Sequence, residues 1–456
     1  MPVPPDVLNA AEAYLVEVVG ALEASGPAEE GLSMPAWTRR DGGYFHEVQR
    51  TEPEWSGRLR AARDVVESLP AGGELEATAR AAGVPLDQEV GTVLGVSLMD
   101  AETVAAGLRW RYLELAGMQV DCDVMRAGAH DWFVDLVAES ESFVWVAPIL
   151  GLEMYEPIKL GEGLELARLN DDEIAWCLKM GLRVGPSVGA RFVGDLAGIR
   201  LTCALDRVAS PFWGDDFEAM HAINRTISDS AEKLVAALRV WKTGGIACPL
   251  AVGYGEGWSM SGFCRGGPVS DSHVYPIGPP IQLGEHDTEA FLSRWNDLER
   301  HAAHSVLAAA IHRFSLACSR PDPRDRLVDL TIACESLFLS DTGSVQERGE
   351  LKYRLALRAC TFVEVEGLTR RQLFDRVGRA YNIRSRIVHG EASPTDTAND
   401  PVTEQTVPLH EFVASIEEIV RCALRKAVGL PTLPRRAIVE DWDELVVGPK
   451  TTAPQP

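Results

Sequence analysis

Residues 381–390 read YNIRSRIVHG and place an arginine and a histidine five positions apart, near the end of a helical pattern. A guanidinium holds a phosphate through a planar fork of N–H donors, and an imidazole exchanges protons near neutral pH. These two groups could cleave RNA without a metal. The imidazole would act on the ribose 2′-OH or the leaving 5′-oxygen, and the guanidinium would stabilise charge on the phosphoryl oxygens. Arg384 and His389 are the candidate catalytic residues, and the expected products end in a 2′,3′-cyclic phosphate. The spacing by itself favours a structural role instead, a satisfied histidine and a surface arginine.

The spacing of this pair raises a geometric difficulty. Five residues advance a helix by roughly 500°, so Arg384 and His389 would lie about 140° apart on a continuous helix. Gly390 follows, and glycine just past a last turn tolerates the left-handed conformation that ends a helix. We expect the helix to fray at His389, so that its imidazole can turn toward Arg384 or toward a partner chain. Arg386, three residues before His389, is a second candidate for phosphate contact.

Glu335 is a supporting candidate because it interrupts the apolar face of the helical segment 325–339. A buried carboxylate needs a partner, and Arg354 or Arg358 on the next helical segment is the expected one. A structural ion pair is favoured over a catalytic role. A role in orienting Arg384 is compatible with both.

The elements that must position these residues form a predicted all-helical bundle. Apolar residues recur at spacings of three and four from residue 287 almost to Gly429, which indicates amphipathic helices joined by short links. Thr369 is a plausible N-cap for the helix that carries the candidate pair. The predicted helices are 288–314, 325–339, 351–363, 373–388 and 409–428.

The remaining chain predicts further regions, since 456 residues are too many for one ordinary core. Residues 1–140 read as a mainly helical N-terminal region. Residues 141–286 read as a mixed region with β-strands, including 143–147 and 199–205. Residues 431–456 form a Pro-rich C-terminal tail that is expected to be extended or disordered. The expected fold class is α+β multidomain, a mixed α/β N-terminal region followed by the helical bundle over residues 287–430.

The net charge of −23 is unevenly distributed. Residues 1–286 carry 22 Lys and Arg against 42 Asp and Glu, whereas residues 287–430 carry 19 against 21, and 17 of these cations are arginines. An arginine-rich surface favours phosphate recognition, although such charges can equally decorate solvated helix faces. The acidic N-terminal region is instead expected to regulate the bundle, by sensing a protein or a small-molecule ligand or by shielding its basic face.

Several classes of protein are excluded by what the sequence lacks. No apolar run approaches the ~20 residues of a membrane span, so no membrane partner is expected. Nine scattered cysteines without a CxxC pair, and an N-terminus unlike a secretory signal, predict a cytoplasmic protein with reduced thiols. No cofactor or metal is expected. His301 and His304 lie three apart without a third ligand nearby, so packing or solvation is the preferred interpretation.

Three segments in order resemble the Apea-like branch of the HEPN superfamily, whose all-helical domains occur in prokaryotic ribonuclease toxins and phage-defence proteins. They are DRLVDLTIACESLFL at 325–339, ELKYRLALRA at 350–359 and residues 381–390. The resemblance implies a homodimer through the helical bundle, in which two Arg-x-x-x-x-His segments face one another and form a composite site. Arg384 and His389 would be the motif pair. Ser385 stands where active members carry Asn, Asp or His, and serine can still donate or accept a hydrogen bond.

Three functional hypotheses follow. The first is a metal-independent HEPN-type endoribonuclease that cleaves RNA in defence or as a toxin and is regulated by the acidic N-terminal region. The second is a catalytically inactive HEPN-like protein that serves in dimerisation or in nucleotide or RNA binding, with Ser385 marking the loss of activity. The third is a sugar- or polyphosphate-directed sensor in which residues 141–286 carry the binding.

Overall fold

The computed structural model divides the chain into two compact units, and each combines segments that are distant in the sequence. The first unit comprises Met1–Pro148, Gly161–Asp229 and Leu250–Val269. The second comprises Ile149–Leu160, Ser230–Pro249 and Ser270–Pro456. The domain boundary expected after residue 140 therefore falls inside the first unit, and the one expected after residue 286 falls inside the second. The described residues are 3–26, 33–40, 44–84, 86, 88–92, 95–99, 101–138, 140–182, 191–192, 196–206, 215–255, 264–269, 276–341, 351–390 and 396–448.

The N-terminal part of the first unit is a cluster of helices with its own apolar core. Its helices are α1 (Pro5–Ala24), α2 (Glu54–Ala61), α3 (Arg63–Glu67), α4 (Pro70–Ala81), α5 (Ala101–Ala116) and α6 (Cys122–Leu136). Two hairpins accompany them, β1 (Ser33–Arg40) with β2 (Tyr44–Thr51) and β3 (Gln88–Thr92) with β4 (Gly95–Met99). Tyr14, Trp132 and Phe133 are buried at the centre of this cluster.

A six-stranded sheet follows, in the order β12-β11-β5-β10-β8-β7. Its strands are β5 (Ser140–Pro148), β7 (Ile158–Gly161), β8 (Leu164–Arg168), β10 (Ala197–Asp206), β11 (Leu250–Gly255) and β12 (Cys264–Pro268). The two-residue strand β9 (Arg191–Phe192) pairs with β2. The strands predicted at 143–147 and 199–205 are confirmed as parts of β5 and β10, which pair antiparallel. A mixed α+β fold is therefore present. The helices α7 (Asp171–Lys179) and α8 (Asp215–Trp241) complete this region.

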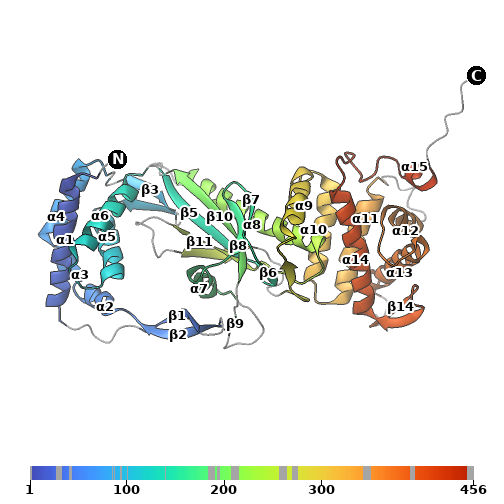
Figure 1. Ribbon diagram of the computed structural model, residues 1–456, viewed down its shortest axis with the longest axis horizontal. Helices are drawn as coiled ribbons and strands as arrows, with labels where there is room; N and C mark the ends of the chain where they lie inside the picture. The colour runs from blue at the N-terminus through green and yellow to red at the C-terminus, as the bar shows by residue number, and fades with distance from the viewer. Residues whose placement is uncertain are drawn as a thin grey trace, which may run out of the picture. The chain divides into compact units, whose positions relative to one another are not determined.

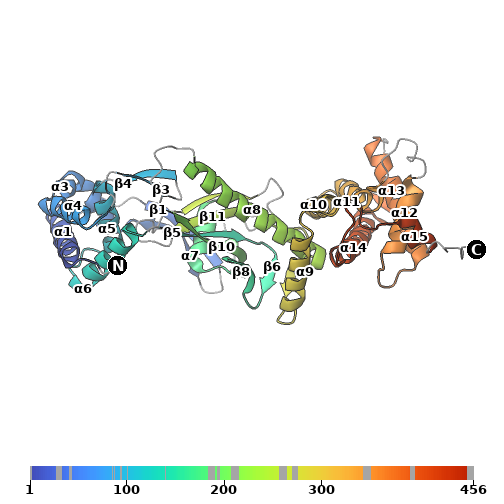
Figure 2. The same cartoon turned by 90° about the horizontal axis from the view of Figure 1, so that it is seen from above.

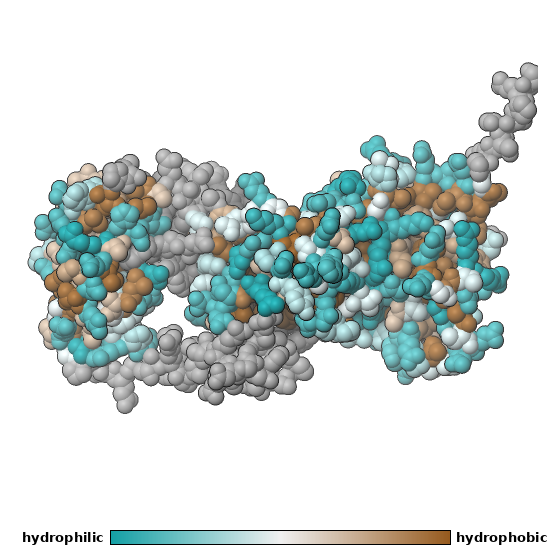
Figure 3. All heavy atoms as spheres, in the orientation of Figure 1, coloured by the Kyte–Doolittle hydropathy of each residue, from teal (hydrophilic) through white to brown (hydrophobic). Residues whose placement is uncertain are grey.

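The second unit is mainly helical. Its helices are α9 (Thr288–Arg300), α10 (Ser305–Ser319), α11 (Pro323–Leu339), α12 (Leu351–Phe362), α13 (Arg370–Val388), α14 (Leu409–Val428) and α15 (Trp442–Val447). Its short strands are β6 (Leu152–Met154) with β13 (Ile281–Leu283), and β14 (Thr397–Asp400) with β15 (Gln405–Pro408). The helices α10, α11 and α14 lie side by side, and α12 and α13 pack on α11 (Figures 1 and 2). On the face seen in Figure 3, hydrophobic side chains over these helices are scattered among hydrophilic ones.

The prediction of a single helix over residues 288–314 is wrong, because the helix is interrupted between Arg300 and Ser305. His304 caps α10: its Nδ1 accepts from the Leu307 N–H at 3.2 Å, and its Nε2 donates to the Pro434 carbonyl at 2.7 Å. His301 Nε2 bonds to the Leu430 carbonyl at 2.8 Å. Both imidazoles are thus held by the backbone, as the structural interpretation of these histidines expected.

The prediction of an extended or disordered tail is also wrong for part of residues 431–448. Asp441 caps α15 by accepting from the Asp443 and Glu444 N–H groups at 2.9 and 3.0 Å. Trp442, 4% exposed, packs at 5.8 Å from the Phe338 ring and 6.1 Å from the Phe362 ring, measured between centroids. The tail folds here because it completes an aromatic cluster on α11 and α12. Residues 449–456 lie outside the described part of the chain.

Candidate functional site

The candidate pair lies on α13, which ends at Val388 as predicted and begins at Arg370, three residues before the predicted start, directly after the predicted N-cap Thr369. Thr369 forms a capping box with Gln372: its hydroxyl accepts from the Gln372 N–H at 3.3 Å, and its own N–H donates to Gln372 Oε1 at 2.9 Å. Gly390 has φ +70°, the left-handed conformation expected just past the last turn. Local signals alone therefore determine where this helix begins and ends.

His389 does not fray from the helix as predicted. Its backbone has φ −84° and ψ 4°, and its N–H donates to the Ser385 carbonyl at 3.0 Å, which continues the helical hydrogen bonding. The imidazole is exposed to solvent. Because the helix stays regular, Arg384 and His389 remain about 140° apart around its axis. One chain by itself does not bring the two candidate side chains together.

Arg384 faces α11, where its partner is Glu335. The distance between Arg384 Nη2 and Glu335 Oε2 is 3.6 Å, and the two side chains are 24% and 27% exposed. A charge-assisted N–H···O bond is shorter, about 2.7–2.9 Å. The Nε atom of Arg384 is buried without a hydrogen-bond partner in the described structure. Glu335 therefore positions the guanidinium without fully engaging it, and the exposed part of the Arg384 side chain could meet an incoming phosphate oxygen.

The partner expected for Glu335 on α12 is not the one observed. Arg358 instead bonds to Asp341 Oδ1 at 2.6 Å and to the Phe338 carbonyl at 2.7 Å. Glu335 pairs across to α13, so the alternative role in orienting Arg384 agrees with the observed contact. Ser385 is half-buried next to Arg384, and Arg386 is exposed.

Glu335 should make the stability of the second unit depend on pH. Burial raises the pKa of the Glu335 carboxyl above its usual range, and the charge of Arg384 partly opposes this rise. A carboxyl whose pKa is raised in the folded state contributes stability that is complete below its unfolded pKa of about 4.3. This stability is lost as the pH rises through the folded pKa. The Glu335→Gln variant has no carboxyl to ionise at this position. Its free energy of unfolding, measured in urea, should therefore fall less than that of the native chain as the pH rises above about 4.3. An unchanged profile would contradict the burial of this carboxyl.

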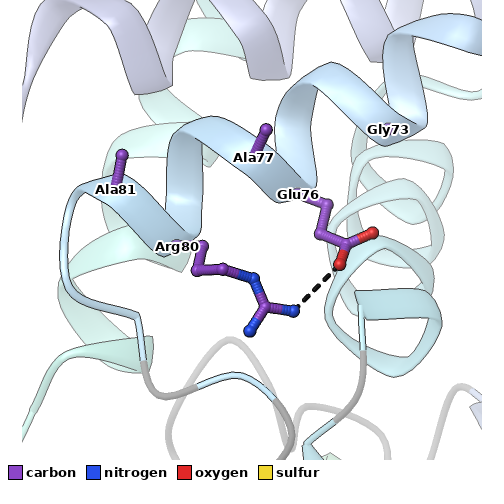
Figure 4. Close-up of a pocket in the computed structure, with 5 residues that line it drawn as sticks. All are labelled: Gly73, Glu76, Ala77, Arg80 and Ala81. Atoms are coloured by element: carbon purple, nitrogen blue, oxygen red, sulfur yellow. Dashed lines mark hydrogen bonds and ion pairs between the residues drawn. The ribbon is translucent and has the colours of Figure 1, made fainter.

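Two surface depressions lie away from this pair. One, on α4, is lined by Gly73, Glu76, Ala77, Arg80 and Ala81, and an Arg80–Glu76 ion pair of 3.0 Å lies along it (Figure 4). The other has a volume of about 640 Å³ and is lined by α12, the end of α14 and the tail, with Lys426 and Arg435 among its residues. Neither is lined by Arg384, Glu335 or His389.

Within the described ranges, no three His, Cys, Asp or Glu side chains are grouped so that they could hold a metal ion. None of the helices in that part of the chain is long and apolar enough to span a membrane. No family model, no curated protein and no solved structure matches this chain significantly. The resemblance to HEPN domains therefore stays a prediction.

One group of residues on α12 and α13 was not predicted from the sequence. Tyr353 is an exposed aromatic residue that contacts Phe374 on α13. The sequence feature that could have identified Tyr353 is its position between Lys352 and Arg354, in a basic stretch of the chain.

Proposed function

We propose that this protein is a metal-independent endoribonuclease of the HEPN type and that it acts as a homodimer. The observation that carries the proposal is the state of Arg384: its guanidinium pairs with Glu335 only at 3.6 Å, and 24% of its side chain is exposed to solvent. A charge-assisted hydrogen bond would be shorter, about 2.7–2.9 Å, so the guanidinium retains donors for an acceptor such as a phosphoryl oxygen. The resemblance of residues 325–339, 350–359 and 381–390 to HEPN domains supports the same function.

The geometry of α13 supports the proposal of a dimer. Arg384 and His389 point about 140° apart on one helix, so a single copy cannot direct both at one phosphate. A twofold axis pairs residue i of one copy with residue j of the other, and j with i. We infer that Arg384 of one protomer and His389 of its partner serve the same phosphate. The exposure of His389 at the helix end leaves its imidazole accessible to a second copy.

The chemistry assigned to each group is simple. The His389 imidazole takes the proton of the ribose 2′-OH or gives one to the leaving 5′-oxygen. Arg384 donates hydrogen bonds to the phosphoryl oxygens as their negative charge grows. Glu335 is a positioning residue, because it holds the guanidinium through its side chain and does not reach the reacting atoms itself.

A second candidate function is RNA binding without cleavage. It is favoured by the divergence of Arg384 and His389 within one chain and by Ser385 at the position where active HEPN domains carry Asn, Asp or His. This alternative needs no dimer and no proton transfer.

One experiment separates the two functions. The full-length protein is incubated in EDTA with an RNA oligonucleotide and with its 2′-O-methyl analogue, which lacks the nucleophile. The nuclease is expected to cleave only the RNA and to leave 2′,3′-cyclic phosphate ends, detected by mass spectrometry. Binding of both oligonucleotides without cleavage would favour the second candidate. Cleavage that requires added metal would contradict both.

A further inference from the structure

Tyr353 on α12 presents an aromatic ring to solvent beside several cations. The residue is 53% exposed, and its ring meets Phe374 on α13 edge to face, with centroids 5.6 Å apart and planes at 72°. The guanidinium of Arg371 lies over the same Phe374 ring, 5.6 Å from its centroid. The edge-to-face contact supports the tyrosine ring and leaves surface on which a flat partner could stack.

The surface formed by α12 and α13 connects this ring with His389, and Gly378, between Arg371 and His389 on α13, is itself buried against Lys352 and Ala356 of α12. Arg371 and His389 are eighteen residues apart, which is roughly five helical turns, so they lie on the same side of the helix about 27 Å apart. Arg386 lies about 60° from that line and is exposed. Lys352 reaches the same face from α12: a Cβ built on Gly378 would stand 3.4 Å from Lys352 Cε. Because Gly378 has no side chain, it leaves room for Lys352.

The segment that forms α12 and α13 carries more cationic than acidic residues. Residues 351–390 contain nine Lys and Arg against three Asp and Glu. Some of the arginines are neutralised internally, such as Arg376, which pairs with buried Asp400 at 2.6 Å. Arg371 instead pairs with Asp375 at 2.8 Å while its side chain is 80% exposed. Such an exposed pair contributes about 0–1 kcal/mol, so a phosphate can replace Asp375 at little cost.

We propose that the surface formed by α12 and α13, from Tyr353 and Arg371 to His389, binds single-stranded RNA. Tyr353 stacks on one unpaired base, and Arg371, Lys352 and Arg386 contact successive phosphates. The bases of a duplex are stacked on each other and offer no free face to a tyrosine ring. Tyr353 should therefore favour single-stranded RNA over a duplex. The choice of RNA as the polymer rests on the proposed function, whereas the binding itself requires no cleavage. This surface, which we call the track, leads the bound RNA strand to the His389 imidazole at the end of α13.

The test measures binding of a fluorescein-labelled 2′-O-methyl oligouridylate of about twelve nucleotides, within the range of single-strand sites, by anisotropy in EDTA at low salt. This probe cannot be cleaved through a 2′-OH. Tyr353→Ala in the full-length protein should weaken binding about ten- to hundredfold, the usual effect of losing one stacked base. Tyr353→Phe should bind nearly as tightly as the native chain. Arg371→Gln should weaken binding and lower the salt dependence by about 0.7 in the log–log slope.

Tyr155 provides a matched control, because it is also exposed, at 72%, but its neighbours in sequence include Glu153 and Glu156. Tyr155→Ala should leave binding unchanged. The track is overturned if Tyr353→Ala binds as tightly as the native chain, if Tyr155→Ala weakens binding as much, or if a duplex binds as well as the single strand.

Failure of the track and failure of the proposed function can be distinguished. If the native protein binds the probe through Tyr353 but cleaves no RNA, the nuclease is wrong and the track stands. If the native protein cleaves RNA and Tyr353→Ala neither weakens binding nor slows cleavage, the track is wrong and the nuclease stands.

Discussion

Replacing Glu417 with glutamine is expected to destabilise the second unit by about 3–5 kcal/mol, the usual cost of removing one partner from a buried ion pair. Its partner Arg421 on α14 is 1% exposed. The Arg421 guanidinium donates to the Arg239 carbonyl at 2.8 Å and to Thr243 Oγ1 at 2.9 Å, and it pairs with the carboxylates of Glu417 and Glu418. Without the Glu417 charge, a fully desolvated cation keeps only neutral acceptors and a partly exposed carboxylate.

A second cation makes this loss larger. Arg326 on α11 also pairs with Glu417, and burial lowers the pKa of Arg326 below its usual range. Glutamine has almost the same shape as glutamate, so the expected loss comes from charge and not from a cavity. Urea denaturation would measure this loss of stability, and hydrogen–deuterium exchange would follow it at the α14 amides.

Glu418→Gln is the matched control. Glu418 pairs with Arg421 as well, but its side chain is 36% exposed, so its removal should cost about 1 kcal/mol or less. If Glu417→Gln also cost only about 1 kcal/mol or less, the neutral acceptors and the Phe314 ring beneath Arg421 would be sufficient to hold the guanidinium, and the prediction would be wrong.

The features that the sequence predicted best are those that depend on neighbouring residues. Thr369 and Gln372 form a capping box within one turn, and Gly390 ends α13 two residues after its last helical residue. The strands near residues 143–147 and 199–205 were also recognisable from short runs of β-branched and apolar residues. In each case the recognisable signal lies within a few positions along the chain.

The features that the sequence could not predict depend on distant partners. The break before α10 is stabilised by His304, whose Nε2 bonds to a carbonyl 130 residues further along the chain. Arg421 bonds to the carbonyl of Arg239, 182 residues earlier. The expected helical bundle over residues 287–430 therefore lacks acceptors that its own buried arginine uses. A fragment cut at residue 287 would leave Arg421 without the Arg239 carbonyl and the Thr243 hydroxyl.

The candidate site illustrates the same limit. The pattern of segment 325–339 correctly indicated that the Glu335 carboxylate would need a cation. It could not choose among the arginines of α12 and α13, because both helices pack on α11. The preference for Arg384 is a property of how the three helices cross, and no spacing along the chain encodes that crossing.

The second large effect is expected in catalysis. Loss of a general acid or base typically costs about 10²- to 10⁴-fold in rate, so His389→Ala should reduce RNA cleavage by that factor. Arg384→Ala should cost about 10²- to 10³-fold, as expected for removing a donor that stabilises an oxyanion. His410→Ala and Arg300→Ala, at exposed positions on α14 and α9, are the controls that should retain full activity. The rates would be measured on labelled RNA in EDTA.

Mixing the two inactive variants tests the composite site directly. In a dimer of Arg384→Ala with His389→Ala, one of the two sites combines the intact arginine of one protomer with the intact histidine of its partner. Random pairing makes half of the dimers mixed, so co-expression should restore about a quarter of the native activity. If each site were instead built within one chain, every site would lack one group and the mixture would stay inactive. An inactive mixture in which mixed dimers are demonstrated by differential tags would therefore exclude the shared site.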